Sequence, residues 1–373
     1  MFNNFYQGKR VFLTGHTGFK GSWLAEWLLL LGAEVHGYAL DPQEHERLFD
    51  QLNLSERLAS DTRADLADKG ALMKAIQQAQ PDVVLHLAAQ PLVQLSYDIP
   101  LETFATNVMG TANLLDAVRL AKLSCAVVCV TTDKCYENRE WLHGYRESDP
   151  MGGHDPYSAS KGAAELIISS YRNSFFSATG SQNDPAVHVA SARAGNVIGG
   201  GDWAIDRIVP DCIRALREGG AIPVRNKIAT RPWQHVLEPL SGYLWLGASL
   251  LQQDQRGHGK ALGLESGFNF GPSLTSNRTV ADLVQELLKH AKGDWVDASD
   301  PDANHEATKL NLAIDKAFHL LAWQPVWDFE KTVEATASWY SSEASAVDLQ
   351  QVTAEQIRSY HSDAAEKDIL WAH

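Results

Sequence analysis

Two residues suited to acid–base chemistry stand four positions apart near the middle of the chain. Tyr157 and Lys161 open a stretch with helical spacing, and a separation of four places both side chains on one face of a helix. A neighbouring ammonium lowers the pKa of a phenol, which is about 10 in water, so Tyr157 can take the proton of a hydroxyl group. The pair indicates a site where an alcohol loses this proton while hydride leaves the same carbon.

A second polar group follows an apolar run. Thr132, Asp133 and Lys134 come directly after Ala126–Val130, which has the composition of a buried strand. In a doubly wound sheet, the carboxyl ends of the strands and the beginnings of the next helices face one crevice. We therefore expect these residues beside Tyr157, with Thr132 hydrogen-bonded to the reacting oxygen.

Three glycines lie between a short apolar strand and a helix. Gly15, Gly18 and Gly21 follow Val11–Leu13 and precede apolar positions with helical spacing over 23–31. Gly15 suits a tight turn, Gly18 allows a pyrophosphate to approach the backbone, and Gly21 allows close packing of helix and strand. The N–H groups and dipole of the helix then hold the phosphates. The sequence thus predicts a dinucleotide site, spaced G-x-x-G-x-x-G.

The end of the second strand predicts which dinucleotide binds. Asp41 lies about 20 residues beyond the last glycine, where a carboxylate can accept a hydrogen bond from a ribose hydroxyl. A 2′-phosphate would be repelled there, and no arginine is adjacent in the sequence, so NAD is favoured over NADP. The alternative is a turn aspartate before Pro42. Asp65 and Leu66, after the third apolar stretch, are placed to meet the adenine.

The elements around these motifs alternate between strand and helix, which predicts parallel strands joined by crossover helices. Further strands are expected at 35–40, 83–87, 126–130, 187–192 and 267–270, and helices at 101–121, 160–176 and 231–250. The fold class is α/β: a doubly wound Rossmann sheet with a smaller, interleaved C-terminal α/β domain. Residues 1–193 form the NAD-binding domain, with 228–265 returning to it. Residues 194–227 and 266–373 form the substrate domain.

Composition excludes several classes of protein. The 373 residues are 45% hydrophobic and 21% charged, which suits a soluble globular chain and excludes disorder. The net charge of −14 argues against a nucleic-acid polymer or an anionic membrane as partner. No apolar run reaches 18 residues, the four cysteines form no C-x-x-C pair, and no metal motif is present. We expect a cytoplasmic, reduced protein without a metal.

The motifs together resemble the extended short-chain dehydrogenase/reductases. The resemblance rests on Gly15 to Gly21, Asn107, Tyr157 with Lys161, and Leu321 to Pro325 followed by Phe329-Glu330. More specific stretches are similar to the 4,6-dehydratases of CDP-glucose, an NAD-dependent sugar-nucleotide group. These stretches are Thr132 to Glu140, Gly152 to Tyr157 and Arg231 to His235. The resemblance covers nearly the whole chain.

The resemblance implies an internal redox elimination. NAD accepts hydride from C4 of the glucose, water leaves across C5–C6, and the hydride returns to C6. The product is a CDP-4-dehydro-6-deoxyglucose for deoxysugar and lipopolysaccharide biosynthesis. Asp133 is implied as the acid that protonates the departing hydroxyl. Lys134 departs from the glutamate of related dTDP-glucose dehydratases, and three roles stay open for it: base at C5, positioning group or surface charge.

The resemblance also implies binding residues and an assembly. The implied cofactor positions are Gly15, Thr17, Gly18, Phe19, Lys20, Gly21, Asp41, Asp65, Leu66, Leu87, Ala88, Ala89, Asn107, Tyr157 and Lys161. The implied substrate positions are Gln90, Asn196, Arg207, Arg231 and His235, although a structural histidine is as good an interpretation of His235. Helices near 101–121 and 160–176 resemble a four-helix interface, so a homodimer or homotetramer is expected.

Two other functions fit part of the pattern. A sugar-nucleotide 4-epimerase, or another dehydratase of the same family, shares Tyr157 and Lys161. An epimerase does not need an acid such as Asp133. An NAD-sensing binding protein without catalysis predicts a damaged catalytic set, whereas Thr132, Tyr157 and Lys161 are all present.

Overall fold

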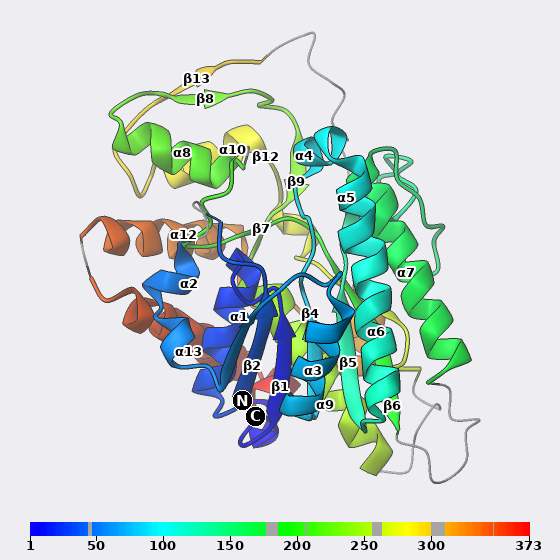
Figure 1. Ribbon diagram of the computed structural model, residues 1–373. Coiled ribbons are helices and arrows are strands. Elements are labelled where there is room, and N and C mark those ends of the chain that lie inside the picture. Colours follow the sequence, from blue (N-terminus) through cyan, green and yellow to red (C-terminus); the bar gives the residue numbers. More distant parts are fainter. Residues whose placement is uncertain (44–46, 177–185, 206, 256–262, 300–309, 346) are drawn as a thin grey trace.

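Seven parallel strands form the central sheet (Figure 1). The computed structural model describes residues 1–373 except 44–46, 177–185, 206, 256–262, 300–309 and 346. The strand order is β11-β6-β5-β4-β1-β2-β3, and each neighbouring pair is parallel. The strands are β1 Arg10–Thr14, β2 Glu34–Ala39, β3 Ser60–Arg63, β4 Val83–His86, β5 Cys125–Val130, β6 Val187–Ala194 and β11 Gly267–Phe270. The predicted doubly wound sheet is confirmed.

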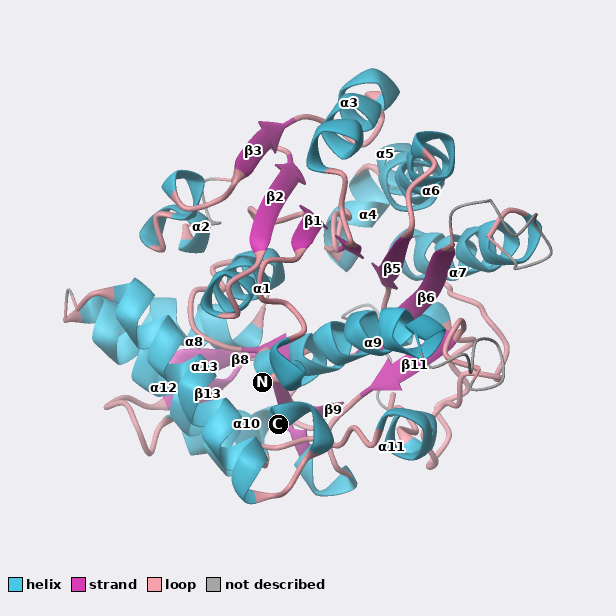
Figure 2. Cartoon of the chain, turned by 90° about the horizontal axis from the view of Figure 1, so that it is seen from below, coloured by secondary structure: helices cyan, strands magenta, loops and turns pink. Residues whose placement is uncertain are grey.

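Helices cover both faces of the sheet, as the view along the strands in Figure 2 shows. One face is covered by α3 Lys69–Ala79, α6 Gly110–Ala121 and α7 Pro156–Ser174, and the other by α1 Phe19–Leu30 and α9 Leu237–Gln255. Along β5, Ala126 and Val128 join the α9 side, while Val127 and Cys129 join the α6 side. Burial on both faces explains why this strand is apolar throughout.

The helix expected over 101–121 is interrupted. After α4 Val93–Asp98, the structure has α5 Pro100–Phe104, a π-helical turn Ala105–Met109 and then α6. Asn107 lies in this turn. Its amide donates hydrogen bonds to the Gln90 carbonyl at 3.1 Å and to Ser160 Oγ at 2.8 Å. The π turn therefore ties the segment after β4 to the start of α7, a common use of such turns near functional sites.

Smaller elements lie beyond the carboxyl ends of the central strands (Figure 1). Three short sheets pair β7 Val197–Ile198 with β10 Gln234–His235, β9 Thr230–Pro232 with β12 Asn277–Thr279, and β8 Ile222–Val224 with β13 Trp295–Asp297. The remaining helices are α2 Leu48–Gln51, α8 Ile208–Arg217, α10 Val280–Leu287, α11 Asp315–Leu321, α12 Phe329–Ala344 and α13 Leu349–Glu366.

Two sequence-based boundaries differ from the structure. The helix expected from residue 231 begins only at Leu237, because residues 230–235 pair as β9 and β10 with distant strands. Backbone pairing with those strands overrides the local helical spacing. β11 pairs with β6 and extends the main sheet. This strand lies within residues 266–373, which were expected to belong to the substrate domain. The segments of the two expected domains thus interleave further than expected.

The two ends of the described chain pack against each other. The Asn3 backbone N–H donates to the His373 carbonyl at 3.1 Å, and the rings of Phe2 and Trp371 stack 5.2 Å apart. Trp371 also meets Trp27 of α1 edge to face. The last residues of the chain therefore complete the packing around its first helix. In the described part of the chain, no helix is long and apolar enough to cross a membrane.

Candidate active site

The glycine loop has the geometry that the sequence predicts. Gly15 has a φ of +74°, which favours glycine, and a Cβ there would lie 2.7 Å from the Ala88 nitrogen. A Cβ on Gly21 would lie 2.0 Å from the Gly15 carbonyl oxygen. Gly18 is the N-cap of α1, and no side chain caps this helix. Backbone N–H groups at the positive end of the helix are thus available for a phosphate, as in dinucleotide sites.

An arginine lies near Asp41 in the structure, which corrects the argument that none is adjacent. Its carboxylate is 88% exposed and lies 3.8 Å from Nη1 of Arg63, so an arginine is adjacent in space although none is adjacent in the sequence. The two meet because β2 and β3 are neighbours. Arg63 also pairs with Asp61, with 2.7 Å between Nε and Oδ1. Two carboxylates share this guanidinium, so the site still disfavours a 2′-phosphate.

Other predicted cofactor positions line the same end of the sheet. Thr17 Oγ1 donates to the Leu40 carbonyl at 3.2 Å, and Asp65 accepts a hydrogen bond from the Tyr38 hydroxyl through its carbonyl at 2.7 Å. Leu66 is buried, and its side chain lies against Gly110 of α6. The segment Leu87, Ala88 and Ala89 follows β4 beside the glycine loop.

Asn107 and Gln90 hold each other rather than facing an open site. Asn107 is buried, and its Oδ1 accepts from the Gln90 N–H at 2.9 Å. The Gln90 side chain donates to Thr103 Oγ1 at 2.9 Å and to the Leu92 carbonyl at 3.1 Å. Both amide side chains therefore hold the loop after β4 in place. Their hydrogen bonds are made within the protein, so they support the backbone of that loop.

The residues predicted to be catalytic lie close together at the start of α7 and the end of β5. Asp155 caps α7 by accepting from the Ser158 N–H at 2.8 Å, so Tyr157 and Lys161 lie in its first two turns. Thr132, which follows β5, lies close enough to the Tyr157 hydroxyl to influence its pKa. The Lys161 ammonium lies 3.5 Å from the Val130 carbonyl oxygen. One strand end and one helix start thus bring these side chains together.

Burial sets the protonation of this pair. It raises the pKa of Tyr157 to about 12, which the hydrogen bond with Thr132 opposes, and it lowers the pKa of Lys161 to about 8. The phenol is therefore protonated at neutral pH in the protein alone, contrary to the expected lowering by Lys161. Tyr157 becomes a base only when further positive charge lies beside it, and a bound nicotinamide ring carries such charge.

Asp133 is placed as an acid. It is 4% exposed, and burial raises the pKa of its carboxyl group against the charges of Lys134, Lys20 and Arg231. Thr132 Oγ1 donates to its Oδ1 at 2.9 Å. A raised pKa keeps a proton available for a leaving group. Lys134 follows Asp133 directly in the chain and is partly buried.

The predicted substrate residues divide into two groups. Arg207 pairs with Asp202 at 2.8 Å, Arg231 lies close enough to influence Asp133, and Asn196 is exposed just after β6. His235 is different. It is fully buried between the rings of Trp23 and Trp327, at 5.7 and 4.9 Å, and burial lowers its pKa to about 3. His235 is a core residue, so its expected contact with substrate is wrong.

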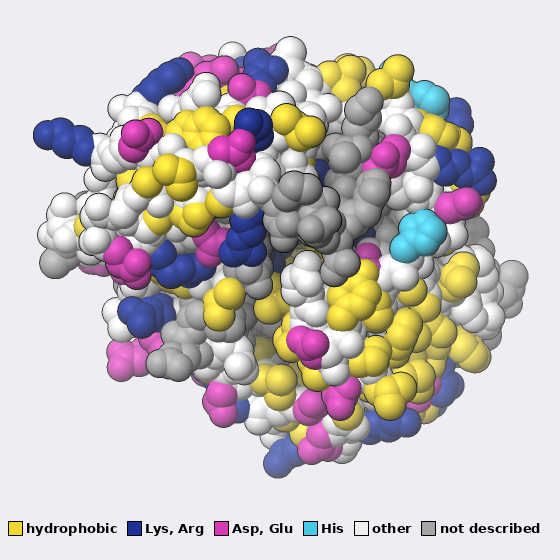
Figure 3. All heavy atoms as spheres, turned by 90° about the horizontal axis from the view of Figure 1, so that it is seen from above, with side chains coloured by type: hydrophobic (Ala, Val, Ile, Leu, Met, Phe, Trp, Pro, Cys, Tyr) yellow, Lys and Arg dark blue, Asp and Glu magenta, His cyan; other side chains and the backbone are white. Residues whose placement is uncertain are grey.

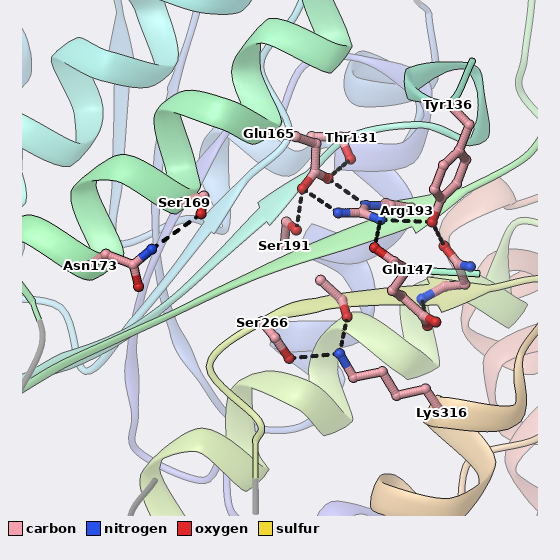
Figure 4. Close-up of polar contacts among 12 residues, drawn as sticks. Thr131, Tyr136, Glu147, Glu165, Ser169, Asn173, Ser191, Arg193, Ser266 and Lys316 are labelled. Carbon is pink, nitrogen blue, oxygen red and sulfur yellow. Dashed lines mark hydrogen bonds and ion pairs between the residues drawn. The ribbon is translucent and has the colours of Figure 1, made fainter. Parts of the chain in front are cut away.

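Sequence reasoning missed a buried ion pair behind the catalytic residues, Glu165 with Arg193 (Figure 4). Glu165 follows Lys161 by four positions, and this spacing was the available signal.

Lys20 was expected to bind the cofactor as part of the glycine loop. Its pKa is lowered to about 8, by burial first and then by the charge of Arg207, and it lies close enough to influence Asp133.

Comparison with known proteins places this geometry among sugar-nucleotide enzymes. A profile of the family described as GDP-mannose 4,6 dehydratase matches residues 12–336. A CDP-glucose 4,6-dehydratase of Salmonella typhimurium is 45% identical over 361 residues, which cover 96% of this chain and 98% of that protein.

Solved structures share the fold. A dTDP-glucose 4,6-dehydratase from Streptomyces venezuelae, solved with NAD bound, superimposes with a TM-score of 0.74 at 23% identity, covering 91% of this chain and 99% of that one. An epimerase from Methanothermobacter thermautotrophicus gives a TM-score of 0.74 at 22% identity, over 96% of this chain and 97% of that one.

Proposed function

Because the chain belongs to the GDP-mannose 4,6 dehydratase family, we propose that it converts CDP-glucose to CDP-4-dehydro-6-deoxyglucose and water. Its 45% identity with a CDP-glucose 4,6-dehydratase over nearly the full length of both proteins supports this substrate. The observation that carries the reaction type is Asp133, a buried carboxyl group with a raised pKa beside Tyr157 and Thr132. Elimination needs a proton donor in that place, and epimerisation does not.

NAD is the cofactor of this proposal. When bound, it accepts a hydride from C4 of the glucose and gives it back at C6. The chain fits this group through Gly15, Gly18 and Gly21, which leave room for a pyrophosphate at the start of α1, and through Asp41 near the expected ribose. Lys161 would hold the nicotinamide ribose from the first turns of α7.

Tyr157 and Thr132 act on the C4 hydroxyl. Thr132 lies close enough to the Tyr157 hydroxyl to influence its pKa and would contact the same substrate oxygen. Tyr157 takes the C4 proton as the carbon becomes a ketone. Because the product keeps this ketone, Tyr157 must release the proton to solvent or to another group before the next turnover. Burial of Tyr157, at 8% exposure, keeps water from competing for this proton.

Asp133 and Lys134 serve the elimination. The 4-ketone acidifies the C5 proton, a base removes that proton, and Asp133 protonates the C6 hydroxyl as it leaves. Lys134 follows Asp133 directly and is the candidate for the base or for a positioning group at C5. Hydride return to C6 and protonation of C5 complete the sequence, so atoms and electrons balance without any external reductant.

The nucleotide part of the substrate would meet the smaller elements above the sheet. We assign diphosphate contacts to Asn196, Arg207 and Arg231, because planar guanidinium groups suit phosphate oxygens. These three residues come from the segments after β6, before α8 and in β9. We retain the division into an NAD-binding part and a substrate-binding part, with β11 counted in the sheet.

We also propose a homo-oligomer in the cytoplasm. Figure 3 shows hydrophobic side chains gathered on the side of the molecule where α4 to α7 lie. The large exposed apolar residues of these helices, of the π turn and of the C-cap of α7 are Leu95, Tyr97, Leu101, Phe104, Met109, Leu120, Leu166 and Phe175. A patch of this kind suits packing against a second copy. The four cysteines are free and buried, which suits a reducing compartment.

One labelling experiment tests the proposal. The protein is incubated with CDP-glucose deuterated at C4 and with NAD, and the mass and label position of the product are determined. Loss of water with deuterium at C6 supports the dehydratase. An unchanged mass with inversion at C4 would show an epimerase, and no change to CDP-glucose alongside turnover of another nucleotide-linked glucose would refute the cytidine nucleotide. If none of these substrates reacts while NAD binds, the binding-protein interpretation replaces the enzyme.

A further inference from the structure

The Glu165 side chain is 5% exposed, and its carboxylate receives four hydrogen bonds (Figure 4). Thr131 Oγ1 donates to Oε1 at 2.5 Å and Ser191 Oγ donates to Oε2 at 2.7 Å. Arg193 donates from Nε to Oε1 at 2.9 Å and from Nη2 to Oε2 at 2.8 Å. These donors hold the pKa of Glu165 below its usual value despite burial. The group therefore ionises more readily than an ordinary glutamate, although it is buried.

The partners of Glu165 lie next to catalytic residues on two elements. Thr131 directly precedes Thr132 at the end of β5. Glu165 itself lies one turn beyond Lys161 and two turns beyond Tyr157 on α7, so the three side chains share one face of the helix. One carboxylate thus bonds the strand end to the helix that carries the acid–base pair.

Arg193 fixes the other side of this carboxylate. Its Nη1 donates to the Tyr136 hydroxyl at 2.7 Å and to the Glu147 carbonyl at 3.2 Å. Tyr136 in turn donates to Asn269 Oδ1 of β11 at 2.7 Å. The network continues from the segment after Asp133, through β6, to the edge of the sheet. Glu165 is therefore held in place independently of any ligand.

The charge on Lys161 depends on what faces it. The titratable groups near its ammonium come from five elements: Glu165 on α7, Cys129 on β5, Cys135 just after β5, His86 on β4 and Lys20 on α1. Burial raises the pKa of both thiols and lowers that of His86 to about 3, so all three are neutral near pH 7. The positive charge of Lys20 disfavours a positive charge on Lys161. Among these groups of the described chain, Glu165 is the anion.

We propose that Glu165 is a positioning residue of the reaction, which keeps Lys161 charged and holds the Thr131–Thr132 strand end against α7. The proposal rests on the proposed function, because it gives the Lys161 ammonium its use in binding the dinucleotide. A purely structural ion pair would contribute to stability and leave the protonation of Lys161 unchanged. The two roles therefore predict different pH behaviour.

The test compares variants that separate charge from packing. Glu165→Gln removes the charge but leaves the buried Arg193 guanidinium without its carboxylate partner, which destabilises the fold. The double variant Glu165→Gln/Arg193→Met removes both charges. A pocket of about 730 Å³ borders both residues, so a polar substitution there can be hydrated. Ser191→Ala is the matched control, since it removes one hydrogen bond and leaves the carboxylate.

The readout is binding of NADH, followed by its fluorescence between about pH 6 and about pH 10, with circular dichroism as a check of folding. In the wild type, affinity falls as Lys161 loses its proton, with a midpoint near pH 8. Loss of an adjacent opposite charge shifts a pKa by about one unit or more, so the midpoint moves that far to lower pH in Glu165→Gln. It moves less far in the double variant, because the opposing charge of Arg193 is removed as well. In Ser191→Ala the midpoint of NADH binding stays near its wild-type value.

Two results overturn the proposal: an unchanged midpoint in either folded Glu165 variant, or failure of the double variant to fold, which would make the role of Glu165 one of stability alone. The pH profile of kcat on CDP-glucose gives a second readout, and its alkaline limb should move with the NADH midpoint. The binding test needs no sugar nucleotide. If wild-type protein binds NADH and does not dehydrate CDP-glucose, the proposed function fails while the result for Glu165 stands.

Discussion

Replacement of Lys161 by methionine should make the protein more stable while it abolishes turnover. The ammonium is 7% exposed, and burial lowers its pKa from 10.5 to about 8. A shift of that size corresponds to a cost of about 3 kcal/mol for keeping the charge in the folded state at pH 7. Methionine has nearly the same length and no charge, so Lys161→Met removes this cost. Glu165 still receives its four hydrogen bonds from other residues.

The sign of the pH dependence follows from the lowered pKa of a cation. Below pH 8 both folded and unfolded chains carry the proton, so the full cost of burying the charge is present in the wild type. Between pH 8 and 10.5 the folded chain has released the proton while the unfolded chain keeps it, so the cost disappears. The advantage of Lys161→Met should therefore fall from about 3 kcal/mol at pH 7 to about 1 kcal/mol at pH 10.

Urea unfolding at both pH values, with no nucleotide added, measures this difference, and Lys74→Met on the exposed side of α3 is the matched control. The control should change the free energy of unfolding by less than about 0.5 kcal/mol at either pH. A Lys161→Met protein that is less stable than wild type at pH 7 would refute the reasoning. So would an advantage that does not shrink by pH 10, since the charge would then not be its cause.

Three further variants test other parts of the site. Tyr157→Phe should lose turnover by about 10²-fold or more and keep NAD affinity, because the phenol moves the C4 proton; a deuterium-labelled substrate assay and a binding titration measure both, and near-normal activity would exclude the phenol as the base. Asp133→Asn should lower kcat by about 10²–10⁴-fold and let reduced nicotinamide accumulate, because C4 oxidation continues without the acid for water loss; if absorbance shows no reduced cofactor, Asp133 acts before elimination. Gly21→Ala should weaken NAD binding and lower the melting temperature, because its Cβ would lie 2.0 Å from the Gly15 carbonyl oxygen; unchanged calorimetric titration and melting curves would contradict this geometry.

The parts of the site that depend on local spacing could be predicted from the sequence. The glycine loop needs only a turn between one strand and one helix, and Tyr157 and Lys161 need only four residues of helix. Their meeting with Thr132 followed from the rule that strand ends and helix starts share one edge of a parallel sheet. These features depend on the spacing of residues in a short segment and on a general rule for parallel sheets. Both can be applied to a single amino-acid sequence.

The parts that depend on pairing between distant strands could not be predicted. Arg63 reaches Asp41 only because β3 lies beside β2, and Arg193 reaches Glu165 across 28 residues. His235 lies close to Arg231 in the sequence and was a candidate for a substrate contact as well as for a structural role. In the structure its ring packs against Trp23 and Trp327 in the core.

The contact between the two ends of the chain has a consequence for synthesis. α1 supports the glycine loop, yet its Trp27 packs against Tyr360 and Trp371, which leave the ribosome more than 300 residues later. The nascent Rossmann sheet can pair its first strands early, but its first helix keeps an uncovered aromatic face until translation reaches α13 and η7 Leu370–Ala372. Full affinity for a dinucleotide should thus arise only after Tyr360 and Trp371 have been synthesised and pack against Trp27.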